Sequence, residues 1–124
     1  HTRLRTVTGV QTCALPIFPA FHYQVGKAGG RLIRCAEYAL YGTQALSDAV
    51  IAALGDRTAC LMANHGMLAH GPTLPAAVAL AAEVEVLSRQ YLIARSAGSP
   101  VLLTDAQMDE ALDRFTRYGQ PEQG

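Results

Sequence analysis

The residue best suited to chemistry is His65, which stands in the tripeptide Asn64-His65-Gly66 between two apolar runs. A tight turn between buried strands holds an imidazole rigidly at the rim of a sheet. Metal ligation requires such rigidity, because ligand geometry must be closely fixed. The spacing also fits the more frequent alternative, a hydrogen-bonded structural histidine. His70 could be a second ligand or an exposed residue at a strand end, and we expect the latter.

Two tyrosines and a second histidine are further candidates. His22-Tyr23 lies at the junction of a predicted strand and helix, where a polar pair could be catalytic. A capping or interface role is the more frequent one there, and we favour it. Tyr118, at the end of the last predicted helix, is a packing residue on pattern alone. The sequence contains no GxGxxG, no P-loop and no GxSxG. The residues by themselves therefore indicate a folded chain with one well-placed histidine.

Composition narrows the class of protein. A chain of 124 residues supports one domain at most, and its 50% apolar and 16% charged residues suit a folded core. Ten basic side chains balance ten acidic ones, so we expect no nucleic-acid partner. Lys27, Arg31 and Arg34 form a loose basic cluster that we interpret as a solvated face. No apolar run approaches the ~20 residues of a membrane span, so we expect no membrane partner.

The three cysteines, Cys13, Cys35 and Cys60, are scattered and form no C-x-x-C pair. An odd, dispersed set fits reduced thiols better than a disulfide framework, so we expect a cytoplasmic protein. Cys60 lies inside an apolar run and is expected to be a small core residue.

The elements that must position these residues follow from turn and cap signals. Thr43 and Thr73 are predicted N-caps, and Thr104-x-x-Gln107 is a capping box. Glycines and prolines mark the ends of the predicted helices. The predicted order is a strand from Ile17, a short helix from Phe21 to Gly29-Gly30, a strand at 32–36, a helix at 43–55, a hairpin with strands at 58–63 and 67–69, a helix at 73–96 and a last helix from Thr104 to Gly119 and Pro121. This order predicts the α/β class.

Residues 1–16 are predicted to lie outside the fold. The chain starts at His1 rather than a methionine, and HTRLRTVTGVQTCALP has neither a signal-peptide core nor a sustained period. Its VTGVQTCALP resembles a translated adapter or vector sequence. We therefore expect a foreign leader that replaces a longer N-terminal part.

Five segments together resemble the class II aldolase/adducin family, and in particular its aldolases acting on L-fuculose 1-phosphate. The segments are PAFHYQVGKAGG (19–30), IRCAEYALYGTQALSD (33–48), ACLMANHGMLAHG (59–71), AAEVEVLSRQYL (81–92) and RFTRYG (114–119). Each is modest alone, but five in order with matching spacing are specific. The resemblance implies a partial three-layer α/β/α domain, the C-terminal part of the family's domain, over residues 17–120, followed by a tail at 121–124.

The resemblance also implies roles for the candidate residues. In such enzymes a glutamate and three histidines hold a divalent metal, usually zinc, and His65 matches the last of these histidines. The other ligands and the phosphate-binding loops would lie upstream. Tyr23 matches a tyrosine that protonates the aldehyde oxygen across a subunit interface in a homotetramer. Tyr118 matches a tyrosine that closes over the site, and Tyr41 stands where a Phe more often lines the aldehyde pocket.

The function implied is that of an aldehyde-lyase that cleaves a ketose phosphate to dihydroxyacetone phosphate and an aldehyde. We expect the 124-residue chain alone to be an incomplete, inactive piece of it. A sugar-phosphate 4-epimerase of the same fold is an alternative. An adducin-like binding module without catalysis is another, although it would not need His65, Tyr23 and Tyr118 together.

Overall fold

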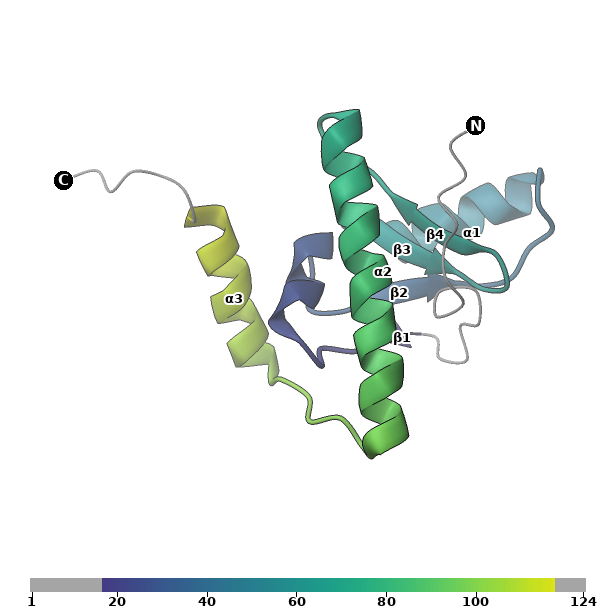
Figure 1. Cartoon of the computed structure of the whole chain (residues 1–124). Helices are drawn as coiled ribbons and strands as arrows, with labels where there is room; N and C mark the ends of the chain where they lie inside the picture. Colours follow the sequence, from purple (N-terminus) through teal and green to yellow (C-terminus); the bar gives the residue numbers. More distant parts are fainter. Residues whose placement is uncertain (1–16, 118–124) are drawn as a thin grey trace.

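Four short strands form a sheet in the order β1-β2-β3-β4, in a computed structural model that describes residues 17–117 (Figure 1). β1 (Ile17–Phe18) pairs antiparallel with β2 (Ile33–Ala36), and β2 pairs parallel with β3 (Ala59–Met62). β3 pairs antiparallel with β4 (Gly66–Ala69), with Met62 opposite Gly66. The predicted hairpin is therefore confirmed.

Helices lie between and after these strands where the turn signals predicted. A 3-10 helix, η1 (Tyr23–Ala28), precedes β2, and α1 (Gln44–Leu54) connects β2 to β3. The long α2 (Leu74–Ala97) and then α3 (Asp105–Arg117) follow β4. Within residues 17–117, no helix is both long and apolar enough to cross a membrane.

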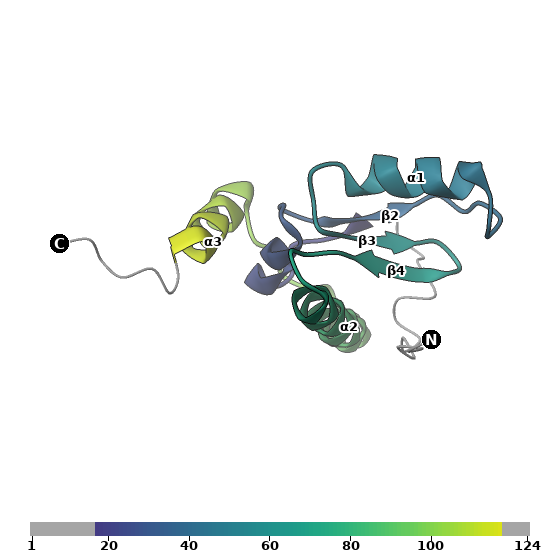
Figure 2. The same ribbon diagram turned by 90° about the horizontal axis from the view of Figure 1, so that it is seen from above.

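The sheet lies between α1 on one face and α2 on the other (Figure 2). Alternate residues of β3 pack on opposite faces of the sheet, as expected for a strand covered on both sides. Ala59 and Leu61 join the buried cluster that contains Leu87 of α2, whereas Cys60 joins the cluster with Val50 of α1. The partial three-layer α/β/α arrangement is confirmed, and so is the core position of Cys60.

The predicted caps are present at all three α-helices. Thr43 Oγ1 accepts a hydrogen bond from the Leu46 amide at 3.3 Å, and Thr73 Oγ1 accepts one from the Ala76 amide at 3.2 Å. At α3 the capping box is reciprocal. The Gln107 amide donates to Thr104 Oγ1 at 3.2 Å, and the Thr104 amide donates to Gln107 Oε1 at 2.9 Å.

The first helix differs in detail from the prediction. It begins at Tyr23 rather than near Phe21, because His22 is its N-cap and still has extended backbone angles. It ends as predicted at Gly29, whose φ of +94° is left-handed and suits glycine. The predicted terminators Gly119 and Pro121 lie outside the described residues, as does the segment 1–16.

Candidate active site

His65 stands in the three-residue turn that joins β3 to β4. Its backbone amide donates a hydrogen bond to the Met62 carbonyl at 3.1 Å, which closes the turn. Asn64 has a φ of +58°, the left-handed conformation that asparagine tolerates better than most residues. The side chain of His65 is exposed. The backbone thus presents the imidazole to solvent from a fixed position.

The turn is rigid because the strand before it is anchored on every side. β3 lies between β2 and β4, and Ala59 and Cys60 are fully buried. The carbonyl of Ala36, the last residue of β2, accepts a hydrogen bond from the Ala63 amide at 3.1 Å. The main-chain ladder therefore continues into the turn itself, and this supplies the fixed geometry that a ligand position needs.

His65 alone does not make a metal site. In the described part of the chain, no three His, Cys, Asp or Glu side chains gather closely enough to hold a metal ion. A zinc site generally uses at least three protein ligands, so residues 17–117 do not fit a complete site. His65 fits one ligand position in donor type, exposure and rigidity.

His70 lies at the other end of the hairpin. It follows β4, whose last residue, Ala69, pairs with Ala59 at the start of β3. Its ring Nε2 is 3.2 Å from the Arg57 carbonyl oxygen, and the side chain is exposed. The expectation of an exposed strand-end residue is confirmed.

Tyr41 lies at the same edge of the sheet as His65. β2 and β3 are parallel, so the segment 37–43 that follows β2 and the turn that follows β3 leave from one edge (Figure 1). Tyr41 is 78% exposed in that segment. The structure therefore places the predicted pocket residue on the rim that carries the predicted ligand.

Tyr23 lies at the opposite edge. Its helix, η1, leads into the start of β2, and the carbonyl of Ala28 accepts a hydrogen bond from the Thr58 amide, just before β3, at 2.8 Å. The four residues of β3 separate this edge from the turn of His65, a length of roughly 13 Å at about 3.3 Å per residue. Within one chain, Tyr23 and His65 are not brought together.

Tyr23 lines a cleft between η1 and α3. Its ring stacks on His22, with centroids 4.7 Å apart, and lies 6.2 Å from the ring of Phe115. The side chain of Tyr23 is 49% exposed. The cleft has a volume of about 340 Å³ and is lined by Tyr23, Gln107, Glu110, Ala111, Arg114 and Phe115.

His22 has the capping role expected for it. Its Nδ1 accepts a hydrogen bond from the Gln24 amide at 3.1 Å, which fixes the ring against which Tyr23 stacks. Tyr118 lies outside the described residues, directly after α3.

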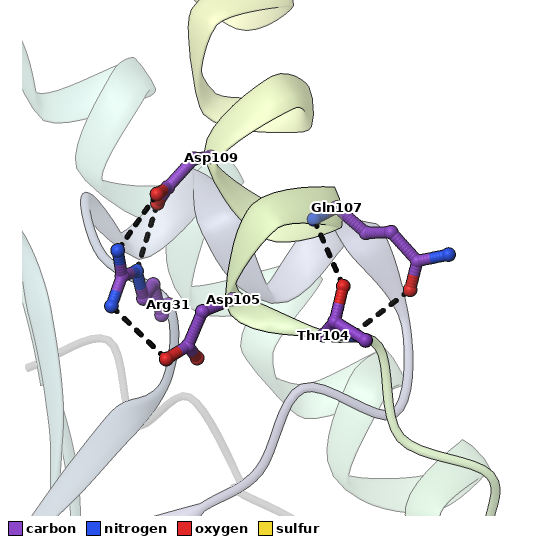
Figure 3. Close-up of polar contacts among 5 residues, drawn as sticks. All are labelled: Arg31, Thr104, Asp105, Gln107 and Asp109. Atoms are coloured by element: carbon purple, nitrogen blue, oxygen red, sulfur yellow. Dashed lines mark hydrogen bonds and ion pairs between the residues drawn. The ribbon is translucent and has the colours of Figure 1, made fainter.

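Arg31 is a residue whose contacts the sequence analysis missed. Lys27, Arg31 and Arg34 are exposed as expected, but Arg31 also forms ion pairs with Asp105 and Asp109 of α3 (Figure 3). Hydrogen bonds from Arg31 hold the pKa of the Asp109 carboxyl below its usual value. The i,i+4 spacing of the two aspartates on one helix was the available signal. Their partner lies 78 positions away from Asp109, beyond any local rule.

Comparison with known proteins places this fold in the class of class II aldolase-type domains. The family model described as Class II Aldolase and Adducin N-terminal domain matches residues 1–92. A solved L-fuculose 1-phosphate aldolase is 38% identical with a TM-score of 0.81, over 87% of this chain and 50% of that one. YgbL from Escherichia coli, at 22% identity and a TM-score of 0.63 over 83% of this chain and 51% of its own, shares the fold.

The chain belongs to the class II aldolase and adducin family. It is 44% identical over 123 residues to a 5-methylthioribulose-1-phosphate/5-deoxyribulose-1-phosphate aldolase of Rhodospirillum rubrum, covering 99% of this chain and 55% of that protein. It is 43% identical over 102 residues to the L-fuculose phosphate aldolase of Escherichia coli K12, covering 82% and 47%. The chain thus spans about half the length of these relatives.

Residues 1–16 fall within the family match, and the Rhodospirillum alignment covers nearly the whole chain. They lie outside the residues that the structure describes, and their interpretation as a foreign leader stays a prediction. The assignment of residues 17–120 to the C-terminal part of the family's domain also stays a prediction.

Proposed function

We propose that the whole protein is a divalent-metal-dependent aldolase that cleaves a ketose 1-phosphate to dihydroxyacetone phosphate and an aldehyde. The observation that carries this proposal is the 44% identity, across 99% of the chain, to an aldolase named for two ketose 1-phosphates. The L-fuculose phosphate aldolases, at up to 43% identity, support the same reaction class with a different aldehyde portion. L-fuculose 1-phosphate and 5-deoxyribulose 1-phosphate are therefore the substrates to test first.

In this proposal His65 is one ligand of a zinc ion. Its support is an exposed imidazole on a turn fixed by the Met62 and Ala36 carbonyls. Bound zinc would act as a Lewis acid on the oxygens of the dihydroxyacetone phosphate portion. The other ligands, a glutamate and two histidines, would come from outside the described residues.

Tyr23 is proposed as the proton donor to the aldehyde oxygen, because it lines a cleft and general acid catalysis needs a donor within hydrogen-bond reach. Tyr23 and His65 lie at opposite edges of the sheet. One site can use both residues if a second copy supplies Tyr23. We therefore propose active sites between subunits, in the homotetramer that the family resemblance implies, with Tyr41 lining the aldehyde pocket and Tyr118 closing it.

A cytoplasmic location completes the proposal. Its support is that Cys35 and Cys60 are both free thiols, which suits a reducing compartment.

The test is an assay of the purified whole protein with both ketose 1-phosphates, following the release of dihydroxyacetone phosphate. We expect turnover that a chelator abolishes and added zinc restores. Conversion of a sugar phosphate into its epimer without net release of dihydroxyacetone phosphate would favour the 4-epimerase alternative. Neither turnover nor stoichiometric zinc binding would favour an adducin-like binding module and would overturn the proposal.

The 124-residue chain alone is a second test. With one of four expected ligands, it should bind zinc weakly and show no aldolase turnover. It should also fold poorly, because apolar side chains such as Leu74, Ile93 and Val101 are left exposed. Measurable turnover by this chain would show that the ligands have been misplaced.

A further inference from the structure

The helix α3 is attached to the rest of the molecule through few side chains. It stands beside η1, on the side away from the sheet (Figures 1 and 2). Met108 is its one fully buried side chain among the described residues. Leu112 and Phe115 pack at Gly26, where a Cβ atom would lie 3.1 Å from Leu112 Cδ2 and 3.0 Å from Phe115 Cε2. The polar contacts at the start of α3 add a directional constraint to this apolar attachment.

Those polar contacts converge on one guanidinium. Arg31 Nε donates to Asp109 Oδ1 at 2.8 Å and Arg31 Nη2 donates to Asp109 Oδ2 at 2.7 Å. Arg31 Nη1 also lies 3.2 Å from Asp105 Oδ2, so the guanidinium pairs with two carboxylates that are one helical turn apart (Figure 3). A bidentate pair fixes direction as well as distance, which a lysine cannot do. We name Arg31, Asp105 and Asp109 the Arg31 clamp.

The helix held by the clamp is also one wall of the cleft at Tyr23. Gln107, Glu110 and Arg114 of α3 line that cleft, and Glu110 follows Asp109 directly. Arg31 lies between η1, which carries Tyr23, and β2. The clamp therefore ties α3 to the segment that follows η1, the helix that begins with Tyr23. A shift of α3 by an ångström would change the shape of the cleft in front of the phenol.

We propose that the Arg31 clamp is a positioning device that sets the cleft at Tyr23 for the aldehyde part of the substrate. This inference rests on the proposed function, in which Tyr23 protonates the aldehyde oxygen. Arg31 touches neither the substrate nor the reacting atoms and acts through α3. Positioning of this kind affects a reaction strongly because small misplacements lose the reactive geometry.

The experiment compares the whole protein with Arg31→Asp, Asp109→Arg and the double variant in which the two charges are exchanged. Amide hydrogen exchange over residues 105–117 measures how firmly α3 is held. We expect exchange to become about tenfold faster or more in each single variant and to return toward the original rate in the double variant. Asp113→Asn is the matched control, because Asp113 pairs with Arg117 of the same helix at 3.4 Å and forms no ion pair with another element within residues 17–117.

Kinetics in the direction of aldol addition then separate positioning from general stability. We expect the KM for the aldehyde to rise about fivefold or more in the single variants, with the KM for dihydroxyacetone phosphate changed less than about twofold. The charge-exchanged variant should recover much of the loss. Arg31→Lys should show an intermediate KM for the aldehyde, because lysine keeps the positive charge but cannot form the bidentate pair with Asp109.

Unchanged exchange in α3 would overturn the clamp. Faster exchange with an unchanged KM for the aldehyde would overturn its positioning role. An equal rise of both KM values would do the same. If the unmodified protein shows no aldol addition at all, the proposed function and the aldehyde role fail together. The exchange data would still decide whether Arg31 holds α3.

Discussion

The edge of the sheet with His65 and the edge with Tyr23 are built by different means. His65 is placed by main-chain hydrogen bonds, including those to the Met62 and Ala36 carbonyls, on a strand whose core residues are fully buried. Tyr23 faces a cleft whose other wall, α3, is attached through a few apolar contacts and the exposed Arg31 clamp. The edge with His65 suits a group whose geometry must not vary. At the edge with Tyr23, the shape of the cleft can be altered by side-chain substitutions alone.

This difference would suit the two chemical tasks proposed for His65 and Tyr23. A metal ligand must keep its geometry through the reaction, and a main-chain ladder provides that. A pocket for the variable part of a substrate is better made from side chains on a separable element, because those can change without disturbing the sheet.

The largest expected effect tests the Tyr23 edge. Removing its hydroxyl in the whole protein, with Tyr23→Phe, should lower kcat about 10²-fold to 10³-fold, because a positioned general acid contributes on that scale. Thermal stability should hardly change, since the one hydrogen bond of the phenol oxygen among the described residues is a long contact of 3.5 Å from Gln24 Nε2.

Tyr38→Phe is the control for this measurement, because Tyr38 is 64% exposed and has no assigned role. Equal losses of kcat in both variants, or full activity in Tyr23→Phe, would remove Tyr23 from the reaction.

The next effect tests the rigidity of the His65 edge. Asn64→Val should lower the free energy of unfolding by about 1–2 kcal/mol, because a β-branched residue is strained at a φ of +58°. Asn64→Gly, which tolerates that conformation, should be close to neutral. Urea unfolding of the whole protein, followed by circular dichroism, measures both. Equal stability of the Val and Gly variants would mean that the turn does not require the left-handed conformation.

The sequence predicted the features that depend on residues close together in the chain, and it did not predict contacts between distant segments. The α-helix N-caps at Thr43, Thr73 and Thr104 and the hairpin around His65 were predictable because each signal lies within a few residues of its effect. The three-layer arrangement followed from the family motifs. The Arg31 clamp was not predictable, because it joins segments distant in sequence and depends on how α3 packs on η1.

The candidate site was predicted less completely. Residue types and motifs selected His65, Tyr41 and Tyr23, but the placement of Tyr23 at the opposite edge follows from strand direction and pairing. The cleft that Tyr23 shares with Glu110 and Arg114 likewise needs the tertiary structure, because its two walls are far apart along the chain.

The smallest expected effect is the pH dependence of the ion pair between Arg31 and Asp109. Hydrogen bonding to Arg31 lowers the pKa of Asp109 in the folded state. The stabilisation from this pair is therefore present above the usual carboxyl pKa of about 3.9 and is lost as the pH falls through the lowered value. An NMR titration of the Asp109 carboxyl carbon should give a midpoint below that of the Arg31→Gln variant. Identical midpoints would show that the two side chains do not interact in solution.

The proposed aldolase function requires His65 to be a metal ligand, and zinc titration of the whole protein tests this most directly. The unmodified protein should bind zinc stoichiometrically, and His65→Ala should lose about tenfold to a hundredfold or more in affinity while keeping its circular dichroism spectrum. His70→Ala, which removes an exposed histidine at the other end of the hairpin, should bind as before. Unchanged zinc affinity in His65→Ala would contradict the assignment of His65 as a metal ligand.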